Sequence, residues 1–299
     1  MDYYLKVFVT VSEHQNFSRA AEELHMTQPA VSQYIRTLEQ TMGTRLLERT
    51  NKYVRLNQAG EIVYYHAQEI LGLYTKMQNL VDDITGKAEG QLKIGASHTF
   101  GEYVLPWMIA TMQERYPDIE PEIMIGNTTE VANLVTNHQL DAGLVEGKLL
   151  HHKLTMDNFA EDYMYVVASP NHDVFRHETS IPLKALENEV WIVREHGSGT
   201  REAMEEMFSD YQCKPKKLIH FGSNQPIKEA VQAGLGISLL SRWAIQRELE
   251  NQDLRIIPVE SLPFIRQFSI ITNSAFKTKA LDVFIDLLKN HEMLKRIHD

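Results

Sequence analysis

The chain contains few of the features that would place it in an oxidising compartment or a membrane. Its 299 residues include one cysteine, Cys213, which excludes a disulfide framework. Lysines at 214, 216 and 217 would lower the pKa of this thiol, but an unreactive thiol is the simpler interpretation. No apolar run approaches the roughly 18 residues of a membrane span, and the N-terminus begins with an amphipathic helix instead of a signal peptide. We therefore expect a cytoplasmic protein without a membrane partner.

Recognisable catalytic and cofactor motifs are also lacking. The segment 197–199, Gly-Ser-Gly, is out of phase with the G-x-S-x-G nucleophile elbow. The segment 234–236, Gly-Leu-Gly, has Leu239 where a dinucleotide fingerprint needs its third glycine. His151 and His152 are adjacent and cannot share one helix face as metal ligands. We expect no enzyme activity, no catalytic or metal-binding residue and no cofactor.

Positive charge is scarce overall and is unevenly distributed. The net charge is −10, yet residues 1–60 contain seven Lys and Arg against six Asp and Glu, so this segment carries +1 and the remainder −11. The length suggests two or three domains. Any binding of DNA by the N-terminal segment must depend on where its basic residues lie and on dimer symmetry, and salt should weaken it.

The segment 16–42 has the pattern of a helix–turn–helix. Its first helix would start behind Asn16 or Ser18, and its turn ends in Thr27, a good N-cap, with Pro29 near the first helical position. The second helix has an inward apolar face of Ala30, Val31, Tyr34, Ile35 and Leu38. Its other face carries side chains that read base edges or hold phosphates, namely Gln28, Ser32, Gln33, Arg36 and Gln40. An ordinary amphipathic helix pair is the alternative.

The flanking segments favour a DNA reader. A helix containing Leu5 and Phe8 would complete a three-helix core, and residues 43–56 are predicted to form a hairpin, or wing, with Asn51 and Lys52 at its tip. Between residues 45 and 55, four basic side chains accompany Glu48 alone, a local charge of +3, from Arg45, Arg49, Lys52 and Arg55. Backbone phosphates would lie against such a wing. A solvated charged hairpin is the alternative.

A long helix is predicted from Gln58 to Thr85, with Asn57 as its cap. Apolar residues recur along it at alternating steps of four and three, namely Val63, Ala67, Ile70, Tyr74, Met77, Val81 and Ile84. This heptad seam favours a two-helix coiled coil, although Ile62, Leu71, Leu73 and Leu80 widen the stripe as intramolecular packing would require. At a span of roughly 40 Å the helix outgrows the small winged domain, so we expect it to form a dimer.

These motifs together resemble the LysR-type transcriptional regulators. The resemblance rests on FSRAAEELHMTQPAVSQYIRTLE, GTRLLERT and LNQAGE, with Leu47 where the family often has Phe and Asn57 where Thr is common. It implies a winged helix–turn–helix domain (residues 1–58), a linker helix and hinge (59–89) and an effector-binding domain (90–299). The implied partners are a pseudo-palindromic operator in double-stranded DNA, a small-molecule effector, further copies in a homodimer or homotetramer, and RNA polymerase.

The resemblance also assigns functional residues and a subgroup. The expected DNA contacts are Ser18, Arg19, Thr27, Gln28, Pro29, Ser32, Gln33, Arg36, Arg49 and Lys52. The expected dimer contacts are Val63, Ile70, Tyr74, Met77 and Val81. The GSGTR loop and the LERTNKYV wing look most like regulators of sulfur or carbon assimilation genes in bacteria.

Beyond residue 90 the pattern alternates between strands and helices, as in an α/β domain. Strands are predicted over 92–96, 122–125, 142–145, 163–168, 190–193, 218–220, 236–240 and 266–271. Helices are predicted over 104–116, 131–138, 183–186, 201–209, 227–233 and 279–289. Two lobes (90–161 with 267–299, and 162–266), with hinges near 160–162 and 264–267, resemble the type 2 periplasmic-binding-protein fold.

Three strand-to-helix junctions, 95–99, 126–129 and 194–201, are rich in hydrogen-bond donors. Hydroxyls and free N–H groups at helix N-termini bind anions, so we expect a carboxylate- or sulfate-bearing effector between the lobes. The expected contacts are Ser97, Thr99, Asn127, Ser198, Gly199 and Thr200. The alternative is that Ser97, Thr128 and Thr200 only cap helices. The alternative for the whole chain is a solute-binding or transferase-like protein whose winged domain makes only protein contacts.

Overall fold

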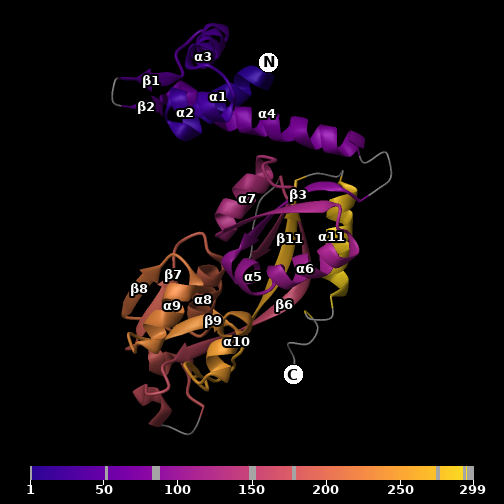
Figure 1. Cartoon of the computed structure of the whole chain (residues 1–299). Helices are drawn as coiled ribbons and strands as arrows, with labels where there is room; N and C mark the ends of the chain where they lie inside the picture. The colour runs from indigo at the N-terminus through magenta and orange to yellow at the C-terminus, as the bar shows by residue number, and fades with distance from the viewer. Residues whose placement is uncertain are drawn as a thin grey trace. The chain divides into compact units, whose positions relative to one another are not determined.

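The computed structural model describes residues 2–50, 53–82, 88–147, 153–176, 180–273, 277–291 and 294. They form two compact units, an N-terminal helical unit and a C-terminal α/β unit, each described by itself below (Figure 1). Lys52 at the predicted wing tip, the pair His151-His152 and the predicted end of the linker helix lie outside the described residues. None of the described helices is both long and apolar enough to cross a membrane.

The N-terminal unit contains the predicted helix–turn–helix, within α1 (Asp2–His14), α2 (Phe17–Glu23) and α3 (Gln28–Met42). The Asn16 side chain caps α2 by accepting the N–H groups of Ser18 and Arg19 at 2.9 and 3.1 Å. The Thr27 hydroxyl accepts the N–H of Ala30, and Pro29 lies in the first turn, where a missing N–H costs nothing. The predicted caps are confirmed.

The inner face of α3 packs into a three-helix core. Val31, Ile35 and Leu38 are at most 2% exposed and lie against apolar side chains of α1 and α2. Tyr34 is half-buried, and its ring contacts the rings of Tyr3 and Tyr4 with centroids 5.3 and 5.0 Å apart. The spacing of apolar residues along this helix therefore predicted its buried face.

The predicted wing and linker helix follow. The strands β1 (Leu47–Arg49) and β2 (Val54–Leu56) pair antiparallel, and α4 covers Gln58–Asp82. The Asn57 side chain accepts the N–H of Gly60 at 2.8 Å, as its predicted capping role requires. A Cβ atom at Gly60 would lie 2.0 Å from the Leu46 carbonyl oxygen, so the start of α4 can approach the wing only with glycine here.

The C-terminal unit is built on a mixed sheet with the order β10-β6-β11-β5-β3-β4, in which β9 also pairs with β6, and on a parallel pair, β7-β8. The strands are β3 (Gly90–Ser97), β4 (Ile119–Gly126), β5 (Ala142–Glu146), β6 (Thr155–Ala168), β7 (Val190–Arg194), β8 (Lys217–Phe221), β9 (Ser238–Ser241), β10 (Arg255–Ile256) and β11 (Phe264–Thr272). The helices are α5 (His98–Tyr103), α6 (Leu105–Arg115), α7 (Thr128–Thr136), α8 (Gly199–Asp210), α9 (Asn224–Gln232), α10 (Arg242–Glu250) and α11 (Lys279–Asn290).

Two long strands join two lobes in this unit. Figure 1 shows β6 and β11 running from the lobe that contains α5, α6, α7 and α11 into the lobe that contains α8, α9 and α10. The segments predicted as hinges pair with each other in an antiparallel ribbon, with Asp162 opposite Arg266. Each lobe has its own apolar core, around Phe100 and Phe268 in the first and Trp191 in the second.

Three details of this unit differ from the expectations. Helix α6 confirms the helix predicted over 104–116, with Pro106 in its first turn, but the short helix α5 before it was not predicted. The helix predicted over 183–186 is a 3-10 turn, Leu183–Leu186. Helix α10 was not predicted, although Ser241 caps it by accepting the N–H of Trp243. Short polar helices give a weak periodic signal.

Candidate DNA-binding face and interlobe site

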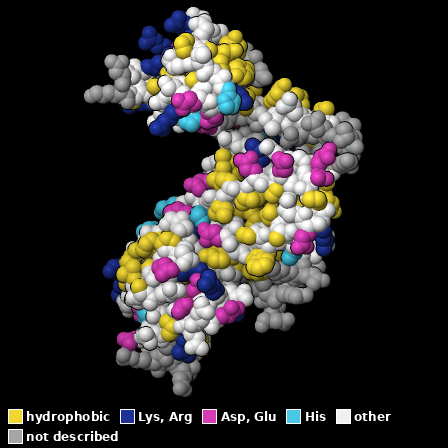
Figure 2. All heavy atoms as spheres, in the orientation of Figure 1, with side chains coloured by type: hydrophobic (Ala, Val, Ile, Leu, Met, Phe, Trp, Pro, Cys, Tyr) yellow, Lys and Arg dark blue, Asp and Glu magenta, His cyan; other side chains and the backbone are white. Residues whose placement is uncertain are grey.

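The outer face of α3 presents the predicted base-reading residues together. Gln28, Gln33 and Arg36 are exposed, and Ser32 is half-buried beside them. The Gln28 amide donates to the Ser32 hydroxyl at 3.0 Å, which orders both side chains on one face. Figure 2 shows Lys and Arg side chains gathering at the end of this unit that carries α3. An exposed, polar helix face of this kind can enter a major groove.

The residues at the starts of α2 and α3 are also exposed. Ser18 and Arg19 lie in the first turn of α2, and Thr27 and Pro29 lie at the start of α3. Helix N-termini and the polar groups near them are common contacts for DNA phosphates. Their exposure is compatible with the DNA contacts expected of them, which stay a prediction.

Arg49 has a structural role that sequence reasoning missed. Its Nη2 donates to Glu39 Oε2 at 2.8 Å, and its guanidinium carbon lies 4.9 Å from the centre of the Phe17 ring. Glu39 Oε1 also accepts the N–H groups of Leu46 and Leu47, at 3.0 and 3.3 Å. The local charge of +3, counted over residues 45–55, therefore left out the nearby carboxylate of Glu39. Arg49 therefore fixes the wing to α3, and the DNA contact expected of it stays a prediction.

The apolar seam of α4 divides into two parts. Ala67 is 1% exposed and Val63 is half-buried, and both pack against the core of the winged domain. The dimer contact expected of Val63 stays a prediction. Further along the helix, Ile70, Tyr74, Met77 and Val81 are between 43 and 59% exposed. Four large apolar side chains on one face of a helix are suited to burial against a second copy.

Between the two lobes of the C-terminal unit, the predicted hydroxyls converge. Ser97 and Thr99 come from the first lobe, Ser198 and Thr200 from the second, and each is 1 to 2% exposed. The guanidinium of Arg266 on β11 lies between them. Its Nη2 donates to Thr99 Oγ1 at 3.2 Å and its Nη1 donates to Thr200 Oγ1 at 3.1 Å. One buried arginine thus connects the two helix starts that the sequence singled out.

Two buried carboxylates share this arginine. Arg266 Nε donates to Asp162 Oδ2 at 2.7 Å, and Asp162 Oδ1 accepts the Ser241 hydroxyl at 2.5 Å. Glu146 Oε1 lies 3.5 Å from Arg266 Nη1, while its Oε2 accepts the Ser97 hydroxyl. Complete burial raises the pKa of Asp162, with Glu146 adding to the effect and Arg266 opposing it. The cluster holds more carboxylate than cationic groups.

The interpretation that Ser97 only caps a helix is wrong. Within the described part of the chain, neither Ser97 nor Ser198 makes a capping hydrogen bond, although each occupies an N-cap position. The Thr128 hydroxyl donates to the Glu146 carbonyl, and the Thr200 hydroxyl accepts from Arg266. Asn127 does act as a cap, because its side-chain oxygen accepts the N–H of Glu130 at 2.9 Å. The effector contact expected of Asn127 at the rim stays a prediction. The next residue but one, Thr129, donates its N–H to the Gly197 carbonyl of the other lobe at 3.1 Å.

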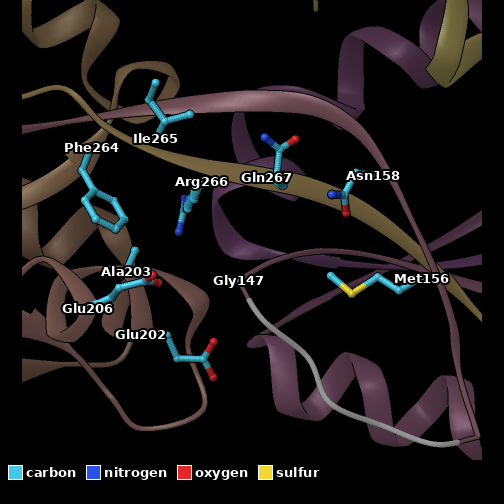
Figure 3. A pocket seen from close by; sticks show the side chains of 10 residues that line it. All are labelled: Gly147, Met156, Asn158, Glu202, Ala203, Glu206, Phe264, Ile265, Arg266 and Gln267. Atoms are coloured by element: carbon cyan, nitrogen blue, oxygen red, sulfur yellow. The ribbon is translucent and has the colours of Figure 1, made fainter. Parts of the chain in front are cut away.

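A cavity of about 620 Å³ lies beside Arg266, with walls from both lobes and the crossing strands. It is lined by Gly147, Met156, Asn158, Glu202, Ala203, Glu206, Phe264, Ile265, Arg266 and Gln267. Figure 3 shows the side chains of Arg266 and Glu202 directed into the space between α8 and these strands. A cavity of this volume accommodates a small metabolite.

Comparison with known families agrees with both units. Residues 4–61 match the bacterial regulatory helix-turn-helix protein model of the lysR family, and residues 85–292 match the LysR substrate binding domain. The chain belongs to the LysR family of transcriptional regulators. This LysR-type regulator binds DNA through its N-terminal unit and has a C-terminal effector-binding domain.

Individual relatives cover nearly the whole regulator. It is 37% identical over 292 residues to the HTH-type transcriptional regulator CysL of Bacillus subtilis, covering 97% of both chains. It is 33% identical over 267 residues to the RuBisCO operon transcriptional regulator of Allochromatium vinosum, covering 89% of this chain and 88% of the relative. The solved regulatory domain of CcmR from Synechocystis, in complex with 2-PG, is 26% identical with a TM-score of 0.63, over 70% of this chain and 99% of that one.

Sequence reasoning missed several residues that organise the interlobe site of this LysR-type regulator. Besides Glu146, Asp162 and Arg266, Asn224 donates to Thr99 Oγ1 at 3.3 Å and accepts from Arg194 Nη1 at the same distance. Asp162 and Arg266 each fall in a segment predicted as a hinge. The sequence could have indicated them, because it places opposite charges in the two segments predicted to cross between the lobes. Nothing in the local pattern distinguished Glu146 or Asn224.

The single thiol is buried in the second lobe. Cys213 is 3% exposed, and its Sγ donates weakly to the Leu183 carbonyl at 3.7 Å. Burial, with Glu187 nearby, raises the pKa of this thiol to about 11. The neighbouring lysines do not lower it, so the interpretation as an unreactive thiol is the one that the structure favours.

Proposed function

We propose that this regulator responds to a small anionic metabolite bound between its two lobes, and that binding changes its affinity for a pseudo-palindromic operator. The observation that carries the proposal is the convergence of Thr99 and Thr200 on Arg266, with Ser97 bonded to the neighbouring Glu146, beside a cavity of about 620 Å³. Hydroxyls and a guanidinium are the groups that bind carboxylate, sulfate and phosphate oxygens.

A relative supports the chemical class of the ligand. The regulatory domain of Synechocystis CcmR was solved in complex with 2-PG, and it aligns with almost all of its length. The RuBisCO operon regulator of Allochromatium vinosum supports the resemblance to regulators of carbon assimilation genes. A small anion derived from carbon or sulfur metabolism is therefore the class of effector to test first.

The site suits binding better than catalysis, and we propose that the chain acts without enzymatic activity. A nucleophilic hydroxyl needs a neighbouring base to remove its proton. Thr99 and Thr200 accept hydrogen bonds from Arg266, whose guanidinium stays protonated in proteins and cannot serve as that base, whereas the Ser97 hydroxyl donates to the Glu146 carboxylate. The proposal therefore rests on the two threonines. Their hydrogen bonds fix the guanidinium of Arg266 between the two lobes, where it can bind an anionic effector.

Coupling to DNA follows from the contacts that cross between the lobes. Arg266 holds Thr99 of the first lobe and Thr200 of the second, so a ligand that rearranges these contacts changes the angle between the lobes. In a dimer held by α4, such a change alters the spacing of the two DNA-binding domains. A differential affinity of about 1–3 kcal/mol for the two arrangements is typical of such coupling.

The proposal is tested with the full-length protein. Small carboxylates, sulfate and phosphate esters are screened by thermal shift, and the strongest ligand is then titrated by calorimetry. Thr99→Val and Thr200→Val keep the shape of each side chain but remove its hydroxyl, so each should weaken binding while leaving basal binding to the DNA upstream of the gene intact. Binding as tight as that of the parent in both variants would place the ligand elsewhere.

A further inference from the structure

Glu146 puts a carboxylate of the protein itself where the anionic group of an effector is expected. It is the last residue of β5, and its side chain is only 2% exposed. Its Oε2 accepts the Ser97 hydroxyl and its Oε1 lies 3.5 Å from Arg266 Nη1. Ser97 and Arg266 are two of the groups to which the proposed function assigns the effector anion, and the inference below rests on that function.

The surroundings of Glu146 are those of a bound anion. A Cβ atom at Gly199 would lie 2.7 Å from Glu146 Cγ, so the Glu146 side chain packs directly on the backbone at the start of α8. This helix begins without a side-chain cap from Ser198, and negative charge near a helix N-terminus is favourable. A serine hydroxyl, a guanidinium and a helix start thus surround one carboxylate.

The two carboxylates of the cluster are not held equally. Asp162 is completely buried, lies opposite Arg266 in the strand register, and accepts Nε at 2.7 Å as well as the Ser241 hydroxyl. Glu146 has one hydroxyl donor and a looser ion pair of 3.5 Å. Since one guanidinium cannot neutralise both, Glu146 is the carboxylate that can leave at the smaller cost. Its neighbour Gly147 lines the cavity, so the cavity edge is directly beside it.

We propose that Glu146 is a built-in competitor of the effector and a determinant of its specificity. The anionic group of the effector takes over the Ser97 hydroxyl and the outer side of the Arg266 guanidinium, and the Glu146 carboxylate moves away toward the cavity. Asp162 remains the permanent partner of Arg266. The exchange sets a threshold, because an anion binds only when its contacts exceed those that Glu146 gives up. Neutral ligands gain nothing from the exchange.

The test uses Glu146→Gln in the full-length chain, with inorganic sulfate and phosphate as probes in calorimetric titrations. Glutamine keeps the size of the side chain and can still accept from Ser97, but it removes the competing charge. We expect roughly tenfold or tighter binding of both anions, within the range typical of coupled sites. Circular dichroism and a thermal melt confirm that the variant is folded. Glu229→Gln is the matched control, because it removes the same charge from an exposed position of α9 that does not line the cavity.

A gain confined to Glu146→Gln, and abolished when Thr200→Val is added, supports the proposal. An equal gain in Glu229→Gln would show a general effect of charge and would overturn it, as would parent-like binding in folded Glu146→Gln. In those two outcomes anion binding itself, and with it the proposed function, still stands. Failure of the parent and of both Gln variants to bind either anion would instead contradict the proposed class of effector and the competitor role with it.

Discussion

Arg266 and Asp162 lie directly opposite each other on the two strands that join the lobes, and Arg266 Nε donates to Asp162 Oδ2 at 2.7 Å. The same guanidinium holds Thr99 of one lobe and Thr200 of the other. The strands that connect the lobes therefore also provide the guanidinium that bonds to residues of both lobes. The same two residues thus belong both to the strands that connect the lobes and to the site between the lobes.

The burial of Asp162 predicts a pH dependence of stability. Its pKa in the folded protein is raised above the ordinary value of 3.8, chiefly by burial, so between those two pKa values the folded state binds a proton that the unfolded state has lost. Stability from this group is present at low pH and is lost as the pH rises through the raised pKa. The free energy of unfolding in urea should fall in the parent as the pH rises between the two pKa values of Asp162. It should not fall in this way in Asp162→Asn. The same slope in both proteins would assign the decline to another group.

The outer face of α3 predicts a loss of operator affinity. Arg36→Ala should weaken binding by about 1–3 kcal/mol if the guanidinium makes a bidentate contact to a base or phosphate. The matched control is Arg247→Ala, which removes an exposed arginine from α10 in the C-terminal unit. Fluorescence anisotropy at fixed salt measures both. An unchanged affinity in a folded Gln28/Arg36 double alanine variant would assign base reading to another face.

The hydrogen bonds between Glu39 and the wing predict a loss of stability when Glu39 is removed. Glu39→Ala removes the acceptor of the Leu46 and Leu47 N–H groups and the partner of Arg49. Buried groups left without partners should cost about 1–3 kcal/mol in the free energy of unfolding. Operator affinity should fall too, although a negative charge is removed, because the wing loses its position. Glu22→Ala, at an exposed position of α2, is the control. If Glu39→Ala bound the operator more tightly and kept the stability of the parent, these hydrogen bonds would not be what positions the wing.

Helix patterns and caps were predictable because each depends on neighbouring residues. Asn16, Thr27 and Asn57 cap the helices that their sequence context indicated. Ser97, Thr99 and Thr200 could be selected as site residues because helix starts at strand ends meet between lobes. The arginine that they contact was hidden, since Arg266 reaches Asp162 across 104 residues of chain. Glu39 was assigned to no role for the same reason: its partners come from a hairpin whose fold must be known first.

The exposed part of the α4 seam predicts a dimer. Ile70→Asp together with Met77→Asp would bury unpaired charge in a coiled coil and should convert the dimer to monomers. Thr75→Asp adds the same charge on another face of the helix and should leave assembly unchanged, since Thr75 is exposed and lies outside the heptad positions. Sedimentation velocity distinguishes the two species. A dimer that survives both seam substitutions would mean that these apolar side chains pack within one chain.

The most direct test of the account measures operator affinity with and without an anionic ligand at constant ionic strength. The parent and the double variant Thr99→Val/Thr200→Val are titrated with labelled operator by fluorescence anisotropy, with chloride replacing the ligand in the reference. We expect the ligand to change the affinity of the parent by about five- to 150-fold. The double variant should bind operator normally and show no response. An equal response in both proteins would contradict the claim that the Arg266 cluster is the effector site.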